Sequence, residues 1–228
     1  MPSIKKIIDP PRMKDKPLHP NLPQPPALIL MIMPVKSGKS TIISNLLLND
    51  DFYGQDFFDL PPKVISTTIN NDLTSRFLKK ACDVADNYKD DYIYNFVKSQ
   101  QKFGQASDMP SACIVIDDCL GEKTTALDNL ASRYRHSNIK IFIVSTQLFR
   151  KVSPTIRSNA TNIFIGKLQN AKELEKLSEE YSDMFGGDDN FRELYTQATA
   201  EKYSFLHLNL QENPAEAWIN FDTKIYPE

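Results

Sequence analysis

The stretch that most constrains the fold runs from residue 27 to residue 49 and reads ALILMIMPVKSGKSTIISNLLLN. Its first seven residues, Ala27 to Met33, are all apolar, which is the pattern of a short strand buried on both faces. A loop follows and ends in Gly38-Lys39-Ser40-Thr41. Apolar residues at positions 42, 43, 46 and 47 then indicate a helix. The sequence therefore predicts a strand, a tight loop and a helix in direct succession.

This succession is the arrangement of a P-loop. Backbone N–H groups at the start of such a helix point toward phosphates, and the helix dipole favours negative charge there. We expect Lys39 to reach the β- and γ-phosphates of ATP and the Ser40 hydroxyl to ligate Mg²⁺. A chance match to the motif is the alternative, and the strand and helix on either side argue against it. The residues expected to bind the nucleotide are Pro34, Val35, Lys36, Ser37, Gly38, Lys39, Ser40 and Thr41.

Two further strands are predicted to deliver polar side chains to the same edge of a parallel sheet. The apolar run 113–116 ends in Asp117 and Asp118. Asp117 would support Mg²⁺, and Asp118 would orient or deprotonate the attacking water. A second buried strand is predicted at 139–146 and is followed by Gln147, whose amide could bridge a γ-phosphate and a water. An ordinary acidic turn and an exposed loop glutamine are the alternatives for the two sites.

Length and composition fit a globular α/β protein. The chain has 228 residues, of which 41% are hydrophobic and 25% charged, enough for one large domain with a full core. The order of elements predicts a mostly parallel central sheet flanked by helices, with a terminal β-hairpin at 205–210 and 217–221. We expect a helix from residue 72 to about 85. We expect the region 70–105 to lie beside the sheet and not to form part of it. The domain division is a proline-rich arm at 1–26 and a P-loop domain at 27–228.

The arm and the cysteines indicate the setting of the chain. The arm could be a disordered tail or could pack along a neighbouring subunit. Three cysteines without metal-ligand spacing suggest reduced thiols in an intracellular protein. We expect neither a signal peptide nor a transmembrane segment, because no apolar run approaches 18 residues. His207, on an alternating strand, is expected to be a packed histidine and not a ligand.

Positive charge is concentrated in one segment. Residues 129–170 contain no acid but seven lysines and arginines, so the net charge of −2 leaves −2 − 7 = −9 for the rest of the chain. Such a segment attracts phosphate. It could contact a nucleic-acid backbone, supply an arginine to the nucleotide site of a neighbouring subunit, or be a solvated face.

Four stretches resemble the genome-packaging ATPases of large double-stranded DNA viruses and virophages, in the FtsK–HerA superfamily of DNA-pumping motors. They read HPNLPQPPALILMIMPVKSGKST, IVIDD, RYRHSNIKIFIVSTQ and SPTIRSNATNIFIG. The resemblance covers about residues 17–168. It implies a P-loop ATPase that assembles as a hexameric ring and drives double-stranded DNA into a capsid.

The resemblance also carries site residues and partners. Gly38 to Thr41 match the nucleotide-binding motif, Asp117 the Mg²⁺-supporting acid, and Gln147 the polar sensor at a strand end. Arg135 is favoured as an arginine acting in trans, with Arg133 and Arg157 as alternatives. Expected partners are double-stranded DNA and capsid or membrane proteins of the packaging vertex, and the expected location is a viral factory in the host cytoplasm or the virion. Met33 replaces the usual opening glycine, and Asp118 stands where many relatives have glutamate.

Two other functions fit the same motifs. A P-loop kinase acting on nucleotides or small molecules would need an arginine-bearing lid, for which the helices around 72–103 are candidates. A nucleotide-binding scaffold that does not hydrolyse ATP is the second alternative, because Met33 and Asp118 depart from the usual motifs. Stimulation of ATP hydrolysis by DNA would separate both from a DNA motor.

Overall fold

A computed structural model describes residues 18–71, 75–104, 108–120 and 124–227. The predicted arm lies mostly outside the described residues. Its described end packs on the same chain: Leu22 is buried, the Tyr53 hydroxyl donates to the carbonyl of Pro23 (2.8 Å), and Asn21 Nδ2 donates to the carbonyl of Phe221 (2.8 Å). Residues 18–26 therefore join the domain.

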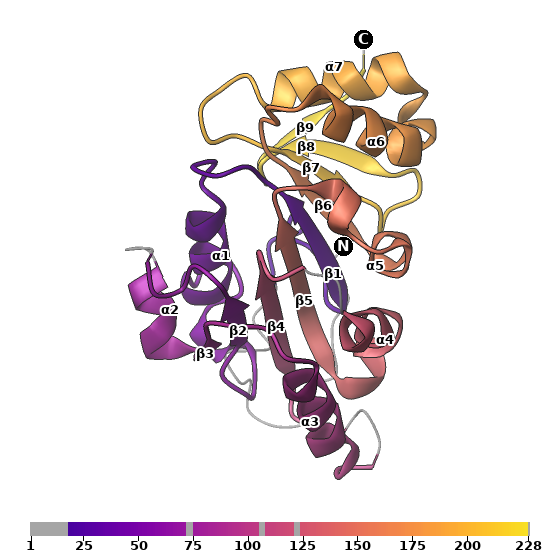
Figure 1. Cartoon of the computed structure of the whole chain (residues 1–228). Coiled ribbons are helices and arrows are strands. Elements are labelled where there is room, and N and C mark those ends of the chain that lie inside the picture. The colour runs from indigo at the N-terminus through magenta and orange to yellow at the C-terminus, as the bar shows by residue number, and fades with distance from the viewer. Residues whose placement is uncertain (1–17, 72–74, 105–107, 121–123, 228) are drawn as a thin grey trace.

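A single sheet organises the described part of the chain, with strand order β3-β2-β4-β5-β1-β6-β7-β8-β9. The first six strands in this order are parallel, and β7, β8 and β9 follow, each antiparallel to the strand before it. Figure 1 shows β1, β4 and β5 side by side at the centre. The strands are β1 Ala27–Ile32, β2 Lys63–Ser66, β3 Asp83–Ala85, β4 Ala112–Asp117, β5 Ile139–Thr146, β6 Asn162–Ile165, β7 Leu206–Asn209, β8 Glu216–Ile219 and β9 Thr223–Ile225.

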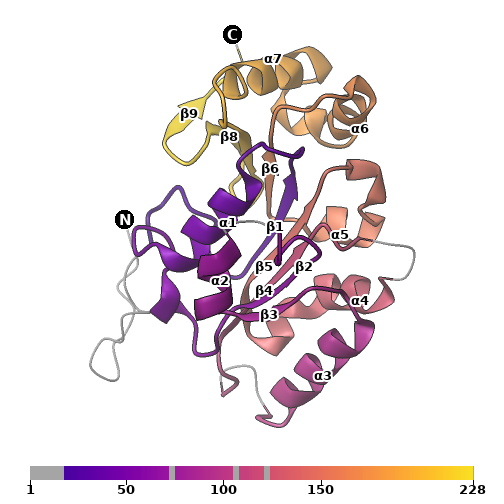
Figure 2. The same cartoon turned by 60° about the vertical axis from the view of Figure 1, so that its left-hand side comes forward.

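Helices cover both faces of the sheet and create two cores. Along β1, Leu28, Leu30 and Ile32 belong to one core, while Ile29 and Met31 belong to the other, as the alternation of a strand requires. Helices α1 and α2 pack on the face that carries Ile29 and Met31, and helices α3 to α7 pack on the opposite face (Figure 2). The helices are α1 Lys39–Leu48, α2 Ser75–Ala81, α3 Asp90–Gln101, α4 Thr125–Arg133, α5 Pro154–Asn159, α6 Ala171–Tyr181 and α7 Asp188–Ala198.

The predicted fold class is confirmed, with one correction between residues 70 and 105. The sheet is mostly parallel, and β7 and β8 form the predicted C-terminal hairpin, which β9 extends. The expected helix to residue 85 is wrong at its end, because α2 stops at Ala81 and Asp83–Ala85 form strand β3. These three residues pair in parallel with β2, so the region 70–105 also contributes a strand to the sheet, contrary to expectation. Val84 packs against the core beside α1, and tertiary pairing thus overrides the local pattern.

Other expectations concern single residues and segments. Cys82, Cys113 and Cys119 form no disulfide. His207 is fully buried, as predicted for a packed histidine. Among the described helices, none combines the length and apolar character needed to cross a membrane.

Candidate nucleotide-binding site

The loop between β1 and α1 is a tight turn that leads into an uncapped helix. Ser37 closes a turn on Pro34, since both its N–H (3.3 Å) and its hydroxyl (2.7 Å) donate to the Pro34 carbonyl. Lys36 and Gly38 have left-handed backbones, with φ of 63° and 92°. Helix α1 begins at Lys39 without a side-chain cap and without an acid in its first turn. Its N-terminus is therefore open to an anion.

Met33 replaces the expected opening glycine of the motif, and its position shows how the chain accommodates it. Its side chain is fully buried in the core beside α1. A Cβ added at Gly166 would lie 3.3 Å from Met33 Cε and 3.5 Å from Pro34 Cδ. Gly166, just after β6, thus leaves the space that Met33 fills. The loop keeps its shape with a large residue at its start.

Lys39 lies between the two acids that end β4. Its Nζ is 2.9 Å from Asp117 Oδ1, and it also forms an ion pair with Asp118 Oδ2. The lysine side chain is only 10% exposed. These three groups carry a net charge of +1 − 2 = −1. A triphosphate added to this cluster would need further positive charge, which a divalent cation can supply.

Asp117 is held by hydroxyl groups from the two neighbouring strands. Ser66 on β2 and Ser145 on β5 both lie in register with it. The Ser66 hydroxyl donates to Asp117 Oδ2 (2.7 Å), and the Ser145 hydroxyl donates to Oδ1. All three residues are buried. The orientation of this carboxylate is therefore fixed by the sheet, and sequence reasoning missed both serines, whose signal is a polar residue near the end of a buried strand.

Asp118 turns the chain away from β4. Its N–H still donates to the carbonyl of Ser145 (3.0 Å), but its φ is 51°, a left-handed conformation that aspartate tolerates better than most residues. This turn directs its carboxylate to Lys39 and to Gln147, whose Nε2 lies 3.4 Å from Asp118 Oδ2. Lys39, Asp117, Asp118 and Gln147 therefore meet at one edge of the sheet.

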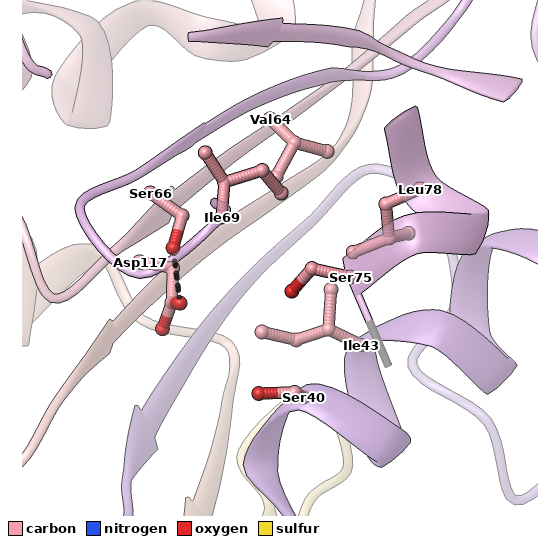
Figure 3. A pocket seen from close by; sticks show the side chains of 8 residues that line it. All are labelled: Ser40, Ile43, Val64, Ser66, Ile69, Ser75, Leu78 and Asp117. Atoms are coloured by element: carbon pink, nitrogen blue, oxygen red, sulfur yellow. Dashed lines mark hydrogen bonds between the residues drawn. The ribbon is translucent and has the colours of Figure 1, made fainter. Parts of the chain in front are cut away.

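A small pocket adjoins this cluster and contains the predicted Mg²⁺ ligands. It measures about 10 Å³, room for about one water molecule. Figure 3 shows the Ser40 hydroxyl and the Asp117 carboxylate on its wall, with Ser66 and Ser75 nearby. Hydroxyl and carboxylate oxygens are ligands that suit Mg²⁺, so the donor set fits this ion.

The predicted trans arginine lies away from the cluster. Arg135 precedes β5, whereas Gln147 follows it, and the eight residues from Ile139 to Thr146 span about 23 Å. Its side chain is exposed, and its guanidinium lies 5.5 Å from the centre of the Tyr134 ring. Arg135 thus cannot reach the nucleotide site of its own subunit.

The other basic residues of the segment 129–170 do not form one patch. Arg133, Arg135 and Lys140 lie at the start of β5, whereas Arg150 and Lys151 follow its end. Two arginines of the segment have acidic partners. Arg157 pairs with Glu180 and lies 5.1 Å from the Phe149 ring centre, and Arg150 Nε lies 3.6 Å from Glu173. The structure therefore places some basic residues of the segment at the amino end of β5 and others at its carboxyl end.

Comparison with known sequences gives two distant viral relatives. The chain is 25% identical over 198 residues to uncharacterized protein 075L of Invertebrate iridescent virus 6, covering 83% of this chain and 73% of that protein. It is 24% identical over 177 residues to uncharacterized protein 088R of Invertebrate iridescent virus 3, covering 76% and 65%. No family model matches the chain.

The solved structures with a similar fold include a viral DNA-packaging ATPase, a viral genome-packaging NTPase and a conjugation coupling protein. The crystal structure of B204, the DNA-packaging ATPase of Sulfolobus turreted icosahedral virus, matches with a TM-score of 0.60 and 17% identity over 85% of this chain and 97% of B204. The genome packaging NTPase B204 of Sulfolobus turreted icosahedral virus 2, in complex with ATP-gammaS, matches with a TM-score of 0.57 and 18% identity, over 84% of this chain and 95% of that protein. The pCW3 conjugation coupling protein TcpA matches with a TM-score of 0.52 and 14% identity, over 89% of this chain and 61% of TcpA. The chain thus has the fold of viral genome-packaging ATPases, and the resemblance inferred from its sequence is confirmed at the level of the fold.

Proposed function

We propose that the chain is an ATPase that moves double-stranded DNA and packages it into a viral capsid. The observation that carries this proposal is the meeting of Lys39, Asp117, Asp118 and Gln147 beside the open N-terminus of α1. The shared fold with B204, a DNA-packaging ATPase, supports DNA as the substrate that is moved.

ATP binding would change the partners of Lys39. The β- and γ-phosphates would lie on the N–H groups of Gly38 to Thr41, and Lys39 would exchange its two carboxylates for phosphate oxygens. Mg²⁺ would be held by Ser40 and by Asp117, directly or through water. When bound, this ion offsets phosphate charge and draws electrons from the γ-phosphate.

Hydrolysis would begin once the Asp118 carboxylate is released from Lys39. This carboxylate would then accept a proton from, or orient, a water that attacks the γ-phosphate. Gln147, which contacts Asp118 through its amide nitrogen, would sense whether the γ-phosphate is present. The residues after Gln147 would transmit that difference, because the backbone N–H of Arg150 donates to Glu173 at the start of α6 (3.3 Å).

A ring of subunits, for which we propose a hexamer, would complete each site. Because Arg135 cannot reach its own site, it would stabilise the charge on the transferred phosphoryl group of a neighbour. The basic loop at 150–157, which follows β5, would contact the DNA backbone. Capsid or membrane proteins of the packaging vertex would hold the ring, and the protein would work in a viral factory or virion.

The test is ATP turnover by the full chain with and without long double-stranded DNA. We expect Mg²⁺-dependent hydrolysis that DNA accelerates and that Lys39→Ala abolishes. Lys98→Ala, which removes an exposed lysine of α3, is the matched control and should leave turnover unchanged. Phosphoryl transfer to nucleoside monophosphates without stimulation by DNA would instead show a kinase. Tight ATP binding without turnover by the assembled protein would show a scaffold.

A further inference from the structure

An exposed tyrosine from a distant part of the chain lies against the P-loop. Tyr203 belongs to the loop between α7 and β7, and a Cβ added at Gly38 would lie 3.6 Å from its Cδ1. In Figure 1 the loop after α7 approaches the loop between β1 and α1. The Tyr203 side chain therefore lies close to the backbone of the P-loop at Gly38.

The backbone around Tyr203 holds this position. Its φ is 71°, a left-handed conformation that an aromatic residue adopts rarely, and such residues persist only where their surroundings enforce them. The next residue, Ser204, is tied to Glu201 by its N–H (3.3 Å) and its hydroxyl (2.8 Å). Phe205 then enters the core, and its N–H donates to Asn220 Oδ1 (3.1 Å). The ring is thus presented by an anchored turn.

Tyr203 is not held there by burial. It is 57% exposed, and Lys202 Nζ lies 4.7 Å from its ring centre. Val35, within the P-loop itself, is also exposed. The site therefore places apolar surface and an extra cation next to N–H groups that suit an anion. A nucleoside triphosphate has this combination, because a flat aromatic base is joined to a chain of anionic phosphates.

We propose that Tyr203 is the surface on which the base of the bound nucleotide stacks, with Lys202 beside it. This inference rests on the proposed binding of a nucleoside triphosphate to the P-loop and adds where its base lies. Stacking is tolerant of base identity, because every base has a π-face. Tyr203 would thus strengthen nucleotide binding without deciding between purines.

The experiment compares binding of ATP and of inorganic tripolyphosphate to the full chain by calorimetry. Tyr203→Ala should weaken ATP binding about tenfold and leave tripolyphosphate binding unchanged, because only ATP has a base to stack. Tyr203→Trp should bind ATP at least as tightly as the wild type. Tyr226→Ala is the matched control: Tyr226 is 66% exposed, and Lys224 Nζ lies 5.5 Å from its ring centre. That variant should bind both ATP and tripolyphosphate with the affinity of the wild type.

Two results would overturn the assignment while leaving the proposed function intact. One is unchanged ATP affinity in Tyr203→Ala when binding still depends on Lys39. The other is an equal loss of ATP and tripolyphosphate affinity, which would mean that the tyrosine only supports the shape of the P-loop. Failure of the wild type to bind either ligand would contradict both the proposed function and this inference.

Discussion

Replacing His207 should remove a pH dependence of folding stability that the wild-type chain carries. This residue is fully buried on β7, and its ring packs edge-on against Phe164 and Phe221. Its Nε2 lies 3.1 Å from Asn162 Nδ2, while its Nδ1 is buried without a hydrogen-bond partner among the described residues. Burial lowers the pKa of His207 from 6.5 to about 3, with the backbone of Asn220 opposing the shift.

The size of the effect follows from the two pKa values. Below pH 6.5 the unfolded chain binds a proton at this histidine, whereas the folded chain stays neutral there until about pH 3. The stability is therefore fully present above pH 6.5 and falls as the pH is lowered through this window. At 1.36 kcal/mol per pH unit, the free energy of unfolding should fall by about 2 kcal/mol at pH 5 from this group alone. The value at pH 5 depends mainly on the unfolded pKa, because the folded histidine is neutral there.

The assay is urea unfolding of the wild type and of His207→Gln at pH 7.5 and pH 5.0. Trp218, the single tryptophan, pairs with His207 across β7 and β8 and reports unfolding by its fluorescence. Glutamine can still accept a hydrogen bond from Asn162 but does not titrate. Between the two pH values the wild type should lose about 2 kcal/mol more than the variant. His136→Gln, at an exposed histidine, should behave like the wild type. Equal losses in the wild type and His207→Gln would refute the reasoning.

Three further predictions concern the site. Ser66→Ala should lower ATP turnover about tenfold with little change in ATP affinity, because it removes one hydrogen bond that orients the Asp117 carboxylate. The control Ser132→Ala, at an exposed serine of α4, should change neither turnover nor affinity. Asp118→Asn should keep the fold, since asparagine tolerates the left-handed backbone, but should lower turnover at least a hundredfold; wild-type turnover would exclude its proposed role. Arg135→Ala should lower turnover about a thousandfold. Mixing it with Lys39→Ala subunits should restore activity, because an Arg135→Ala subunit supplies an intact nucleotide site and its Lys39→Ala neighbour supplies an intact arginine. No recovery would contradict action in trans.

The parts of the site that the sequence predicted are those coded by contiguous patterns. Strands β1, β4 and β5 are clear in the sequence. Asp117 is the last residue of β4, Gln147 directly follows β5, and the loop after β1 leads to Lys39, so these three could be assigned to one sheet edge. Strand β3 could not be predicted, because its three residues are extended only through pairing with β2.

The supporting contacts depend on residues that are far apart in the sequence. Ser66 and Ser145 reach Asp117 only because the strand order places β4 between β2 and β5, and the sequence alone assigned no role to either serine. Tyr203 meets Gly38 through the packing of the α7–β7 loop on the P-loop. The positive charge of residues 129–170 was visible in the sequence, but its division between two edges follows from the direction of β5.

The central claim is that Lys39 and Asp117 belong to one nucleoside-triphosphate site. The most direct measurement is the turnover of Mg²⁺-ATP by the wild type, Lys39→Ala and Lys98→Ala in the presence of long double-stranded DNA. We expect turnover to be lost in Lys39→Ala and retained in Lys98→Ala. Hydrolysis by Lys39→Ala at the wild-type rate would contradict it.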